Sequence, residues 1–272
     1  MKLQGRPNSG AVVANGVTLH YELTGSGPPL LLIMGYRLGS HAWPRPFIDA
    51  LARRFTVLTF DNRGTGRSGK PMHGYAMANM ARDAIALLDT LQIGELTVLG
   101  YSMGGAIAQE VAYAAPYRVR ALILCNTWSG TSTSVLGDGT GFRILRETWL
   151  DPRQAERRLW PITYSRRYLQ TNLREVEEAW RRENEYPTPG HAAVLQFMGL
   201  SRFEMFSRLR GIIAPSLVLA GSEDLLVPPA NGTILARGIR GAELEMLPGV
   251  GHRAMWEVPD QLAGMITRFA AG

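Results

Sequence analysis

The chain has 272 residues, of which 46% are hydrophobic and 19% are charged. This length and composition favour one large globular domain with an insertion, and they exclude an intrinsically disordered chain. The formal net charge is +6, but the cationic residues are scattered, and no run of them is longer than a pair such as Arg53-Arg54. A nucleic-acid-binding surface needs a concentrated basic patch or a recognisable reading module, so we expect no nucleic-acid partner.

The cysteine content and the hydropathy indicate in which cellular compartment the protein is expected. One cysteine, Cys125, is present, within the apolar run 121–125. A single chain therefore forms no internal disulfide, which fits a reducing compartment, and the apolar setting predicts a buried thiol rather than a nucleophile. The N-terminal residues lack the apolar core of a signal peptide, and no apolar run approaches the ~20 residues of a membrane span. We expect a cytoplasmic protein without a membrane span, and nothing in the sequence indicates its oligomeric state.

The predicted elements alternate between strands and helices along most of the chain. Residues 12–21 surround the dipeptide Asn15-Gly16, which predicts a β-hairpin. Later apolar runs lack the alternation of half-exposed strands and suit strands buried on both faces: 30–34, 55–60, 96–99 and 119–124. Helical patterns cover 77–91 and 103–115, and the last third continues with strand 216–220, helix 230–237, strand 243–247 and helix 259–270. This order predicts an α/β fold with a mostly parallel sheet and helices on both faces.

Residues 127–211 interrupt the alternation. They show helical and loop patterns without an obvious strand. We therefore predict a helical cap, or lid, at 127–211, inserted into an α/β core formed by 1–126 and 212–272.

The strongest motif is Gly100-Tyr-Ser-Met-Gly104, directly between the predicted strand 96–99 and the helix that begins at 103. A serine on such a tight strand-to-helix turn has a strained backbone and an exposed hydroxyl, and the flanking glycines avoid collisions with the neighbouring strand and helix. The first N–H groups of the helix point to the place where negative charge develops in acyl transfer. This context favours Ser102 as a nucleophile.

A serine hydroxyl is unreactive at neutral pH, so it requires a base, and the base requires an acid that fixes its tautomer. Asp224 follows the predicted strand 216–220, and His252 follows the strand that ends at Leu247. Parallel strands bring their carboxyl ends to one edge of a sheet, so we expect Ser102, Asp224 and His252 to meet there. Glu223 is the alternative acid, because it is adjacent to Asp224.

Nearly the whole chain resembles the α/β-hydrolase family, in particular its cap-bearing esterases, lactonases, C–C hydrolases and cofactor-free haloperoxidases. Besides the serine motif, the resemblance includes the loop Phe60-Asp-Asn-Arg-Gly-Thr-Gly-Arg-Ser68 and the segments that end at Asp224 and His252. The order Ser, Asp, His along the chain is also that of the family. The resemblance implies an eight-stranded type of sheet. Family members that are dehalogenases or epoxide hydrolases use an aspartate in place of Ser102, which argues against both activities.

The resemblance also implies an oxyanion hole made of two backbone N–H groups. One belongs to the residue after the nucleophile, Met103, and the other to the loop after the third strand, at Tyr36. This loop commonly begins with His-Gly in the family, whereas Met34-Gly35 precedes Tyr36 here. The departure leaves main-chain donors in place but removes the usual basis for inferring a substrate.

These residues predict a serine hydrolase that cleaves a carboxylic ester, including a lactone, through an acyl-enzyme. The alternatives are a C–C bond hydrolase, a perhydrolase or haloperoxidase, or a lyase on the same triad, and a non-enzymatic small-molecule receptor that has kept the triad. The sequence contains no metal-ligand cluster, dinucleotide fingerprint or phosphate loop, so we expect a small-molecule substrate but neither a metal nor a cofactor.

Aromatic residues are dense in the predicted cap, since 11 of the 23 in the chain lie between Thr127 and Arg210. Lids over hydrolase sites are commonly apolar on the inside, so this density suggests a substrate with a bulky or hydrophobic acyl or alcohol group, contacted by cap aromatics such as Trp128, Trp149 and Trp160. The alternative, that these side chains pack the core of the cap itself, explains most of the aromatic residues.

Overall fold

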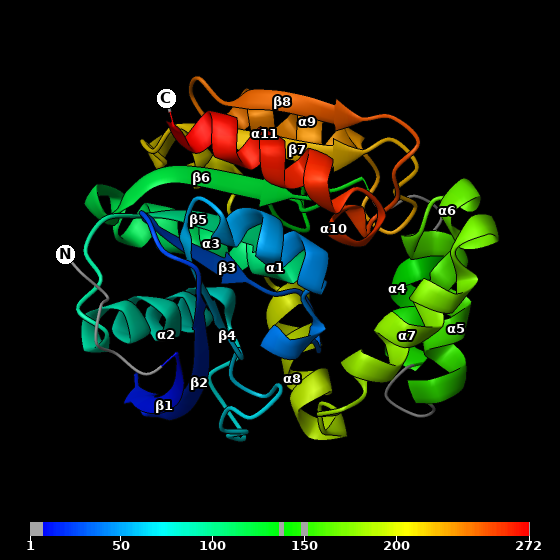
Figure 1. The fold of residues 1–272 in the computed structure, drawn as a ribbon, viewed down its shortest axis with the longest axis horizontal. Helices are drawn as coiled ribbons and strands as arrows, with labels where there is room; N and C mark the ends of the chain where they lie inside the picture. The colour runs from blue at the N-terminus through cyan, green and yellow to red at the C-terminus, as the bar shows by residue number, and fades with distance from the viewer. Residues whose placement is uncertain (1–7, 136–138, 148–151, 272) are drawn as a thin grey trace.

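The structure, a computed structural model, describes residues 8–135, 139–147 and 152–271. Within these residues lies one sheet of eight strands: β1 (Ser9–Ala14), β2 (Val17–Thr24), β3 (Pro29–Ile33), β4 (Thr56–Phe60), β5 (Leu96–Tyr101), β6 (Val119–Cys125), β7 (Ser216–Gly221) and β8 (Glu243–Leu247). Their order across the sheet is β1-β2-β4-β3-β5-β6-β7-β8 (Figure 1). β1 and β2 form the predicted hairpin, β2 pairs antiparallel with β4, and the other pairs are parallel. The predicted mostly parallel sheet is confirmed.

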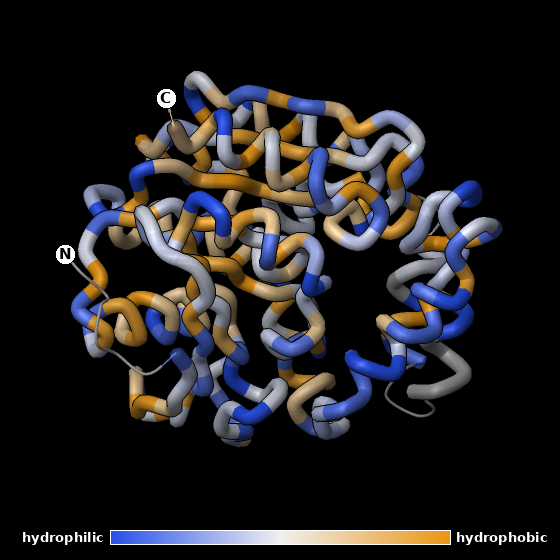
Figure 2. Tube along the Cα trace, viewed as in Figure 1, coloured by the Kyte–Doolittle hydropathy of each residue, from blue (hydrophilic) through white to orange (hydrophobic). Residues whose placement is uncertain are grey.

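Helices cover both faces of the sheet, and this explains the continuous apolar runs. In β3, Leu31 belongs to one buried cluster and Leu32 to the other, on the opposite face, so neither side of the strand meets water. The first face is covered by α2 (Met77–Thr90), α3 (Met103–Ala114) and α9 (Ala230–Gly238), and the second by α1 (Arg45–Ala52) and α11 (Pro259–Ala271). Figure 2 shows hydrophobic residues concentrated along the central strands.

The observed ends of α2, α3, α9 and α11 differ by one residue from the predicted helices. The sequence pattern does not single out α1, a short helix that follows Pro44 and buries Phe47, Ile48 and Leu51. The remaining short elements are α10 (Ala254–Glu257) and the 3-10 helices η1 (Ser40–Ala42), η2 (Pro116–Arg118) and η3 (Phe206–Gly211). In the part of the chain that the structure describes, no helix has the length and hydropathy needed to span a membrane.

A helical insertion separates β6 from β7. It consists of α4 (Thr140–Glu147), α5 (Pro152–Thr163), α6 (Arg166–Thr171), α7 (Leu173–Glu183) and α8 (Gly190–Ser201), as the helical patterns predict. Figure 1 shows α4 to α7 beyond the carboxyl ends of the parallel strands, with α8 closer to the sheet. Leu200 of α8 belongs to the same buried hydrophobic cluster as the apolar residues of α2 and α3. The division into a core at 1–126 and 212–272 and a cap at 127–211 stays a prediction.

Candidate active site

Ser102 lies at the tight turn between β5 and α3. Its φ of 55° is in the left-handed region, which residues with a Cβ rarely adopt and where functional sites store backbone strain. Steric crowding at this turn requires glycine at both flanking positions. A Cβ on Gly104 would lie 2.0 Å from the carbonyl oxygen of Ile33, and one on Gly100 would lie 2.3 Å from that of Gly104. The strand–turn–helix setting predicted for the serine motif is therefore present, with the turn packed against β3.

Replacing Gly104 with Ala should lower the free energy of unfolding by about 1–3 kcal/mol, or prevent folding, because a methyl group forced into a packed interior shifts the backbone. The midpoint of urea unfolding measures the effect. Gly94→Ala is the matched control, since a Cβ there meets no atom within 4 Å, and its midpoint should stay at the parent value or rise slightly. Equal midpoints for the two variants would contradict the explanation that glycine is required at 104 because α3 approaches the carbonyl oxygen of Ile33 closely.

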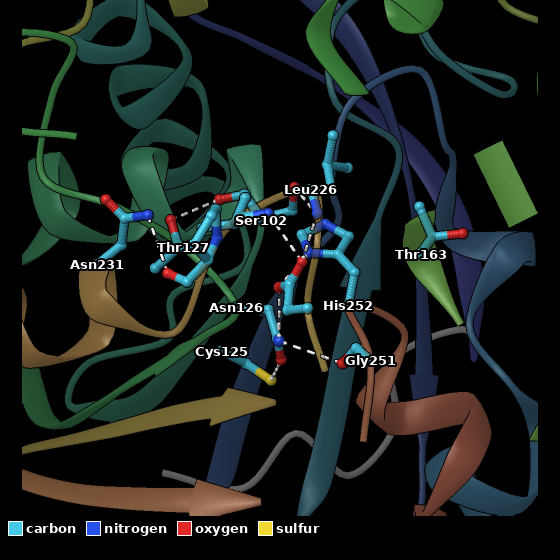
Figure 3. Close-up of polar contacts among 12 residues, drawn as sticks. Ser102, Cys125, Asn126, Thr127, Thr163, Leu226, Asn231, Gly251 and His252 are labelled. Atoms are coloured by element: carbon cyan, nitrogen blue, oxygen red, sulfur yellow. Dashed lines mark hydrogen bonds and ion pairs between the residues drawn. The ribbon is translucent and has the colours of Figure 1, made fainter. Parts of the chain in front are cut away.

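Three polar side chains meet where β5, β7 and β8 end. His252 Nε2 lies 3.0 Å from Ser102 Oγ (Figure 3), and His252 Nδ1 lies 2.7 Å from Asp224 Oδ2. All three residues are buried. This path of hydrogen bonds can pass a proton from the hydroxyl to the imidazole while the carboxylate stabilises the resulting imidazolium.

The Asp224 carboxylate is held by the backbone as well as by the imidazole. Its Oδ1 accepts hydrogen bonds from the N–H groups of Leu226 and Val227, at 3.0 and 2.7 Å. Its Oδ2 accepts one from the side-chain amide of Asn126, at 2.9 Å. These contacts fix the orientation of the carboxylate toward His252.

Asn126 is a residue of the site that the sequence pattern does not single out. It follows β6 directly with a φ of 49°, and its amide also donates to the carbonyl oxygen of Gly251, at 3.3 Å. The signal that could have identified it is a polar residue at the end of a predicted buried strand, at the same sheet edge as Ser102. Glu223, the alternative acid, instead contacts the helical insertion, where its Oε2 accepts a hydrogen bond from the backbone N–H of Arg166 at 3.2 Å.

The two residues predicted for the oxyanion hole lie beside Ser102. Met103 is the first residue of α3, where a backbone N–H has no acceptor within the helix. Tyr36 follows β3 and lines the same pocket as Ser102. Its hydroxyl donates to the carbonyl oxygen of Ala193 in α8 at 3.0 Å, and its ring contacts Phe197 edge-on. The side chain of Tyr36 is therefore anchored on the insertion.

A pocket of about 80 Å³ reaches Ser102. Trp128 and Trp160, predicted to contact substrate, both line it, and so does Trp180, which was not predicted to do so. Trp149 lies outside the described residues. Leucine and valine side chains form much of the remaining wall, and its charged members are Arg37, Glu183 and Arg253. The pocket is thus apolar with a few charged groups, as is common for small-molecule sites.

A second cavity adjoins this pocket between α4 and α8. Its volume is about 450 Å³, and Trp128 and Leu200 line both spaces, so these two side chains stand between them. Phe197 from α8 and Arg143 and Arg146 from α4 contribute to its other walls. Space for a larger ligand therefore exists next to the site, beyond Trp128.

Cys125 plays no visible part in the site chemistry. It lies at the end of β6, fully buried, and burial raises the pKa of its thiol above the ordinary range. The predicted buried thiol is confirmed. Among the described residues, no group of three or more His, Cys, Asp or Glu side chains is placed to hold a metal ion.

Residues 28–259 match the sequence model of the α/β hydrolase fold. This match spans most of the chain, so the protein belongs to the α/β hydrolase fold family, as its sheet order and serine turn indicate. The resemblance predicted from the motifs is confirmed, and the class of protein is a hydrolase.

Similar proteins cover almost the whole chain. It is 34% identical over 259 residues to "Putative carbamate hydrolase RutD" of Azorhizobium caulinodans, with 92% of this chain and 94% of the relative aligned. The enol-lactonase from Burkholderia xenovorans LB400 has a TM-score of 0.85 at 24% identity, covering 97% of this chain and 100% of that structure. Est816, described as an N-acyl homoserine lactone degrading enzyme, has a TM-score of 0.81 at 27% identity, covering 96% and 100%. The similarity therefore includes the insertion as well as the core.

Proposed function

We propose that this hydrolase cleaves a carboxylic ester, including a lactone, through an acyl-enzyme, with Ser102, His252 and Asp224 as its catalytic triad. The observation that carries the proposal is the continuous hydrogen-bonded path from Ser102 Oγ through both ring nitrogens of His252 to Asp224, at the wall of the pocket. The resemblance to Est816, described as degrading a lactone, supports an ester carbonyl as the point of attack.

Each residue has one role in the proposed reaction. Ser102 Oγ attacks the carbonyl carbon while His252 Nε2 takes the hydroxyl proton, and Asp224 stabilises the imidazolium. The N–H groups of Tyr36 and Met103 stabilise the oxyanion of the tetrahedral intermediate. The imidazolium then protonates the leaving alcohol, and the acyl group stays on Ser102. A water molecule, deprotonated by His252, releases the acid in the second half of the cycle.

A carbamate is the second candidate substrate, favoured by the 34% identity to a relative whose name states carbamate hydrolysis. A carbamate carbonyl is bonded to one oxygen and one nitrogen, so the same nucleophile and oxyanion donors suit it. Donation from the nitrogen lone pair makes that carbonyl less electrophilic. We therefore expect a carbamoyl-enzyme to form and to hydrolyse more slowly than an acyl-enzyme.

A panel of p-nitrophenyl esters from acetate to octanoate, a p-nitrophenyl N-methylcarbamate and simple lactones tests the proposal. We expect steady turnover of at least the short esters, and for the carbamate a burst of one p-nitrophenol per active site followed by slow turnover. A stoichiometric carbamate burst with no ester or lactone turnover would favour the second candidate. No reaction with the esters, the carbamate or the lactones would overturn the proposal in favour of C–C bond cleavage, perhydrolysis, a lyase reaction or a receptor.

The size of the pocket limits the acyl group. Its volume of about 80 Å³ is smaller than the ~150 Å³ cavity that accommodates benzene. We infer that a short acyl group fits beside Ser102 while Trp128 stays in place. A longer chain would have to extend past Trp128 into the second cavity.

Trp128→Ala should therefore join the two cavities and raise kcat/KM for octanoate, relative to acetate, by about tenfold or more, since each accommodated methylene is worth ~1–3 kcal/mol. The measurement is the ratio of the two kcat/KM values. Trp160→Ala is the matched control, because Trp160 lines the pocket but is not among the residues that border the second cavity.

Both substitutions remove a buried ring and should lower stability by about 3–5 kcal/mol, so the kinetics are measured below the melting temperature of each variant. The Trp160 variant enlarges the pocket without connecting it and should change the octanoate-to-acetate ratio less. A folded Trp128 variant with the parent's ratio would contradict the proposed path of the acyl chain.

A further inference from the structure

The loop that carries His252 packs directly against the helical insertion. The backbone N–H of Arg253 donates to the carbonyl oxygen of Thr163, the last residue of α5, at 2.9 Å. On the other side of His252, a Cβ on Gly251 would lie 2.6 Å from the backbone nitrogen of Ser165. Both residues next to the histidine in the chain therefore touch the junction of α5 and α6.

Arg253 joins the same loop to α7. Its guanidinium forms a bidentate ion pair with the carboxylate of Glu183, the last residue of α7, through Nη1–Oε1 and Nη2–Oε2 contacts. The guanidinium carbon also lies 5.1 Å from the ring centre of Tyr164 and 4.9 Å from that of Trp256. The Glu183 side chain is only 4% exposed. Two rings and one carboxylate thus fix the side chain of Arg253.

A carboxylate of the core holds the other neighbour of His252. Glu257 Oε1 accepts hydrogen bonds from the N–H groups of Gly251 and Ser165, at 3.1 and 2.9 Å, and Oε2 accepts one from the Ser165 hydroxyl at 2.5 Å. This single side chain binds the His252 loop and the start of α6 together. The loop is consequently held at Gly251 by Glu257 and at Arg253 by Glu183.

Stability alone is a poor explanation for the Glu183–Arg253 pair. Removing two charges from water has a desolvation penalty that their attraction often fails to repay, and apolar side chains of similar volume are frequently as stable or more stable. A buried bidentate pair does fix geometry closely, because the guanidinium fork and the carboxylate fit in few orientations. Both residues line the pocket, and Arg253 is the next residue in the chain after His252, where such geometry matters most.

We propose that Glu183 is a positioning residue for proton transfer: through Arg253 it holds the His252 loop so that Nε2 faces Ser102 Oγ. The proposal rests on the proposed function, in which His252 is the base. A displacement of about 1 Å from reactive geometry can lower a rate about 100-fold. The helical insertion therefore contributes to the alignment of the base, in addition to enclosing the pocket.

The first test is Glu183→Gln, which keeps the shape of the side chain and removes its charge. We expect kcat to fall by about 10- to 100-fold for p-nitrophenyl acetate and for longer esters alike, with KM changed by less than about threefold, because alignment of the base affects every substrate. Arg253→Lys keeps the charge but not the fork and should show the same pattern. A large rise in KM for long esters at constant kcat would overturn the proposal in favour of substrate recognition.

The second test separates positioning from stability. In the double variant Glu183→Leu with Arg253→Met, apolar side chains replace the whole pair, so the melting temperature should recover toward the parent value. We expect kcat to stay low, since the apolar pair lacks the geometry of the fork. Recovery of kcat together with the melting temperature would show that the pair only stabilises the fold and has no specific part in aligning His252, and it would overturn the proposal.

A second ion pair provides the control. Arg208 in η3 donates from Nη1 and Nη2 to Glu110 in α3, at 2.9 and 2.6 Å, and both residues line a different cavity. Glu110→Gln should lower the melting temperature without changing kcat. If the parent neither hydrolyses p-nitrophenyl acetate nor reacts with a fluorophosphonate, the proposed function fails. If the parent does both and Glu183→Gln equals it, only the positioning role fails.

Discussion

Ser102→Ala is expected to reduce kcat by about 10⁴- to 10⁶-fold and to abolish covalent labelling by a fluorophosphonate, because Ser102 carries the hydroxyl that is hydrogen-bonded to His252 Nε2 on the strained turn. Mass spectrometry of the intact protein measures the labelling, and stopped assays with p-nitrophenyl acetate measure the rate. The variant should fold as the parent does, since it loses one oxygen atom and keeps the backbone between Gly100 and Gly104.

Ser129→Ala provides the control for this result. Ser129 is also buried and follows β6, but its hydroxyl lies 3.1 Å from that of Thr133 rather than near the imidazole. Its labelling and kcat should equal those of the parent. Labelling that persists at another serine in the Ser102 variant would place the nucleophile elsewhere.

Asp224→Asn is expected to lower kcat by about 10⁴-fold with little change in KM, because an amide neither holds the required tautomer of His252 nor stabilises the imidazolium. Glu223→Gln should retain most activity, since the Glu223 carboxylate contacts the backbone of Arg166 instead of the histidine. Initial rates with p-nitrophenyl acetate at saturating substrate measure both effects.

These adjacent positions give a paired comparison, because one substitution removes the charge that faces His252 and the other removes a charge one residue away. A mild Asp224→Asn variant together with an inactive Glu223→Gln variant would reverse the assignment of the acid. Circular dichroism is recorded for both, since an asparagine at 224 can keep the two backbone hydrogen bonds to Oδ1, but its NH2 group cannot accept the hydrogen bond from Asn126.

The sheet and the helices that cover it could be predicted because a parallel sheet imposes an unusual pattern. A strand such as β3 sends neighbouring leucines into opposite buried clusters, so its sequence is apolar at every position. The serine motif could be predicted for a related reason, since the approach of Gly104 to the carbonyl of Ile33 leaves no space for a side chain. In both cases a recognisable pattern lies within one short segment, although the neighbour that requires glycine at 104 is distant in the chain.

Other parts of the site depend on contacts between distant segments. Glu183 and Arg253 are 70 residues apart, and Glu183 occurs among several other charged residues, so nothing local pairs the two. Asn126 is local to β6, but its role depends on the position of Asp224, 98 residues later. Trp128, α4 and α8 together line the second cavity, and the helical patterns of the sequence do not show that these segments meet.

Because Cys125 is buried, the reactivity of its thiol can report local unfolding around the end of β6. It is the one cysteine of the chain, and the end of β6 that holds it is fully covered. A thiol-specific reagent such as an aromatic disulfide can react there only when β6 separates from its neighbours, and a raised pKa keeps the thiolate scarce until then. The rate of modification as a function of urea would therefore measure the free energy of local opening at the sheet edge that holds Ser102. Because Cys125 donates to the side-chain oxygen of Asn126, the probe reports on the segment that supports Asp224.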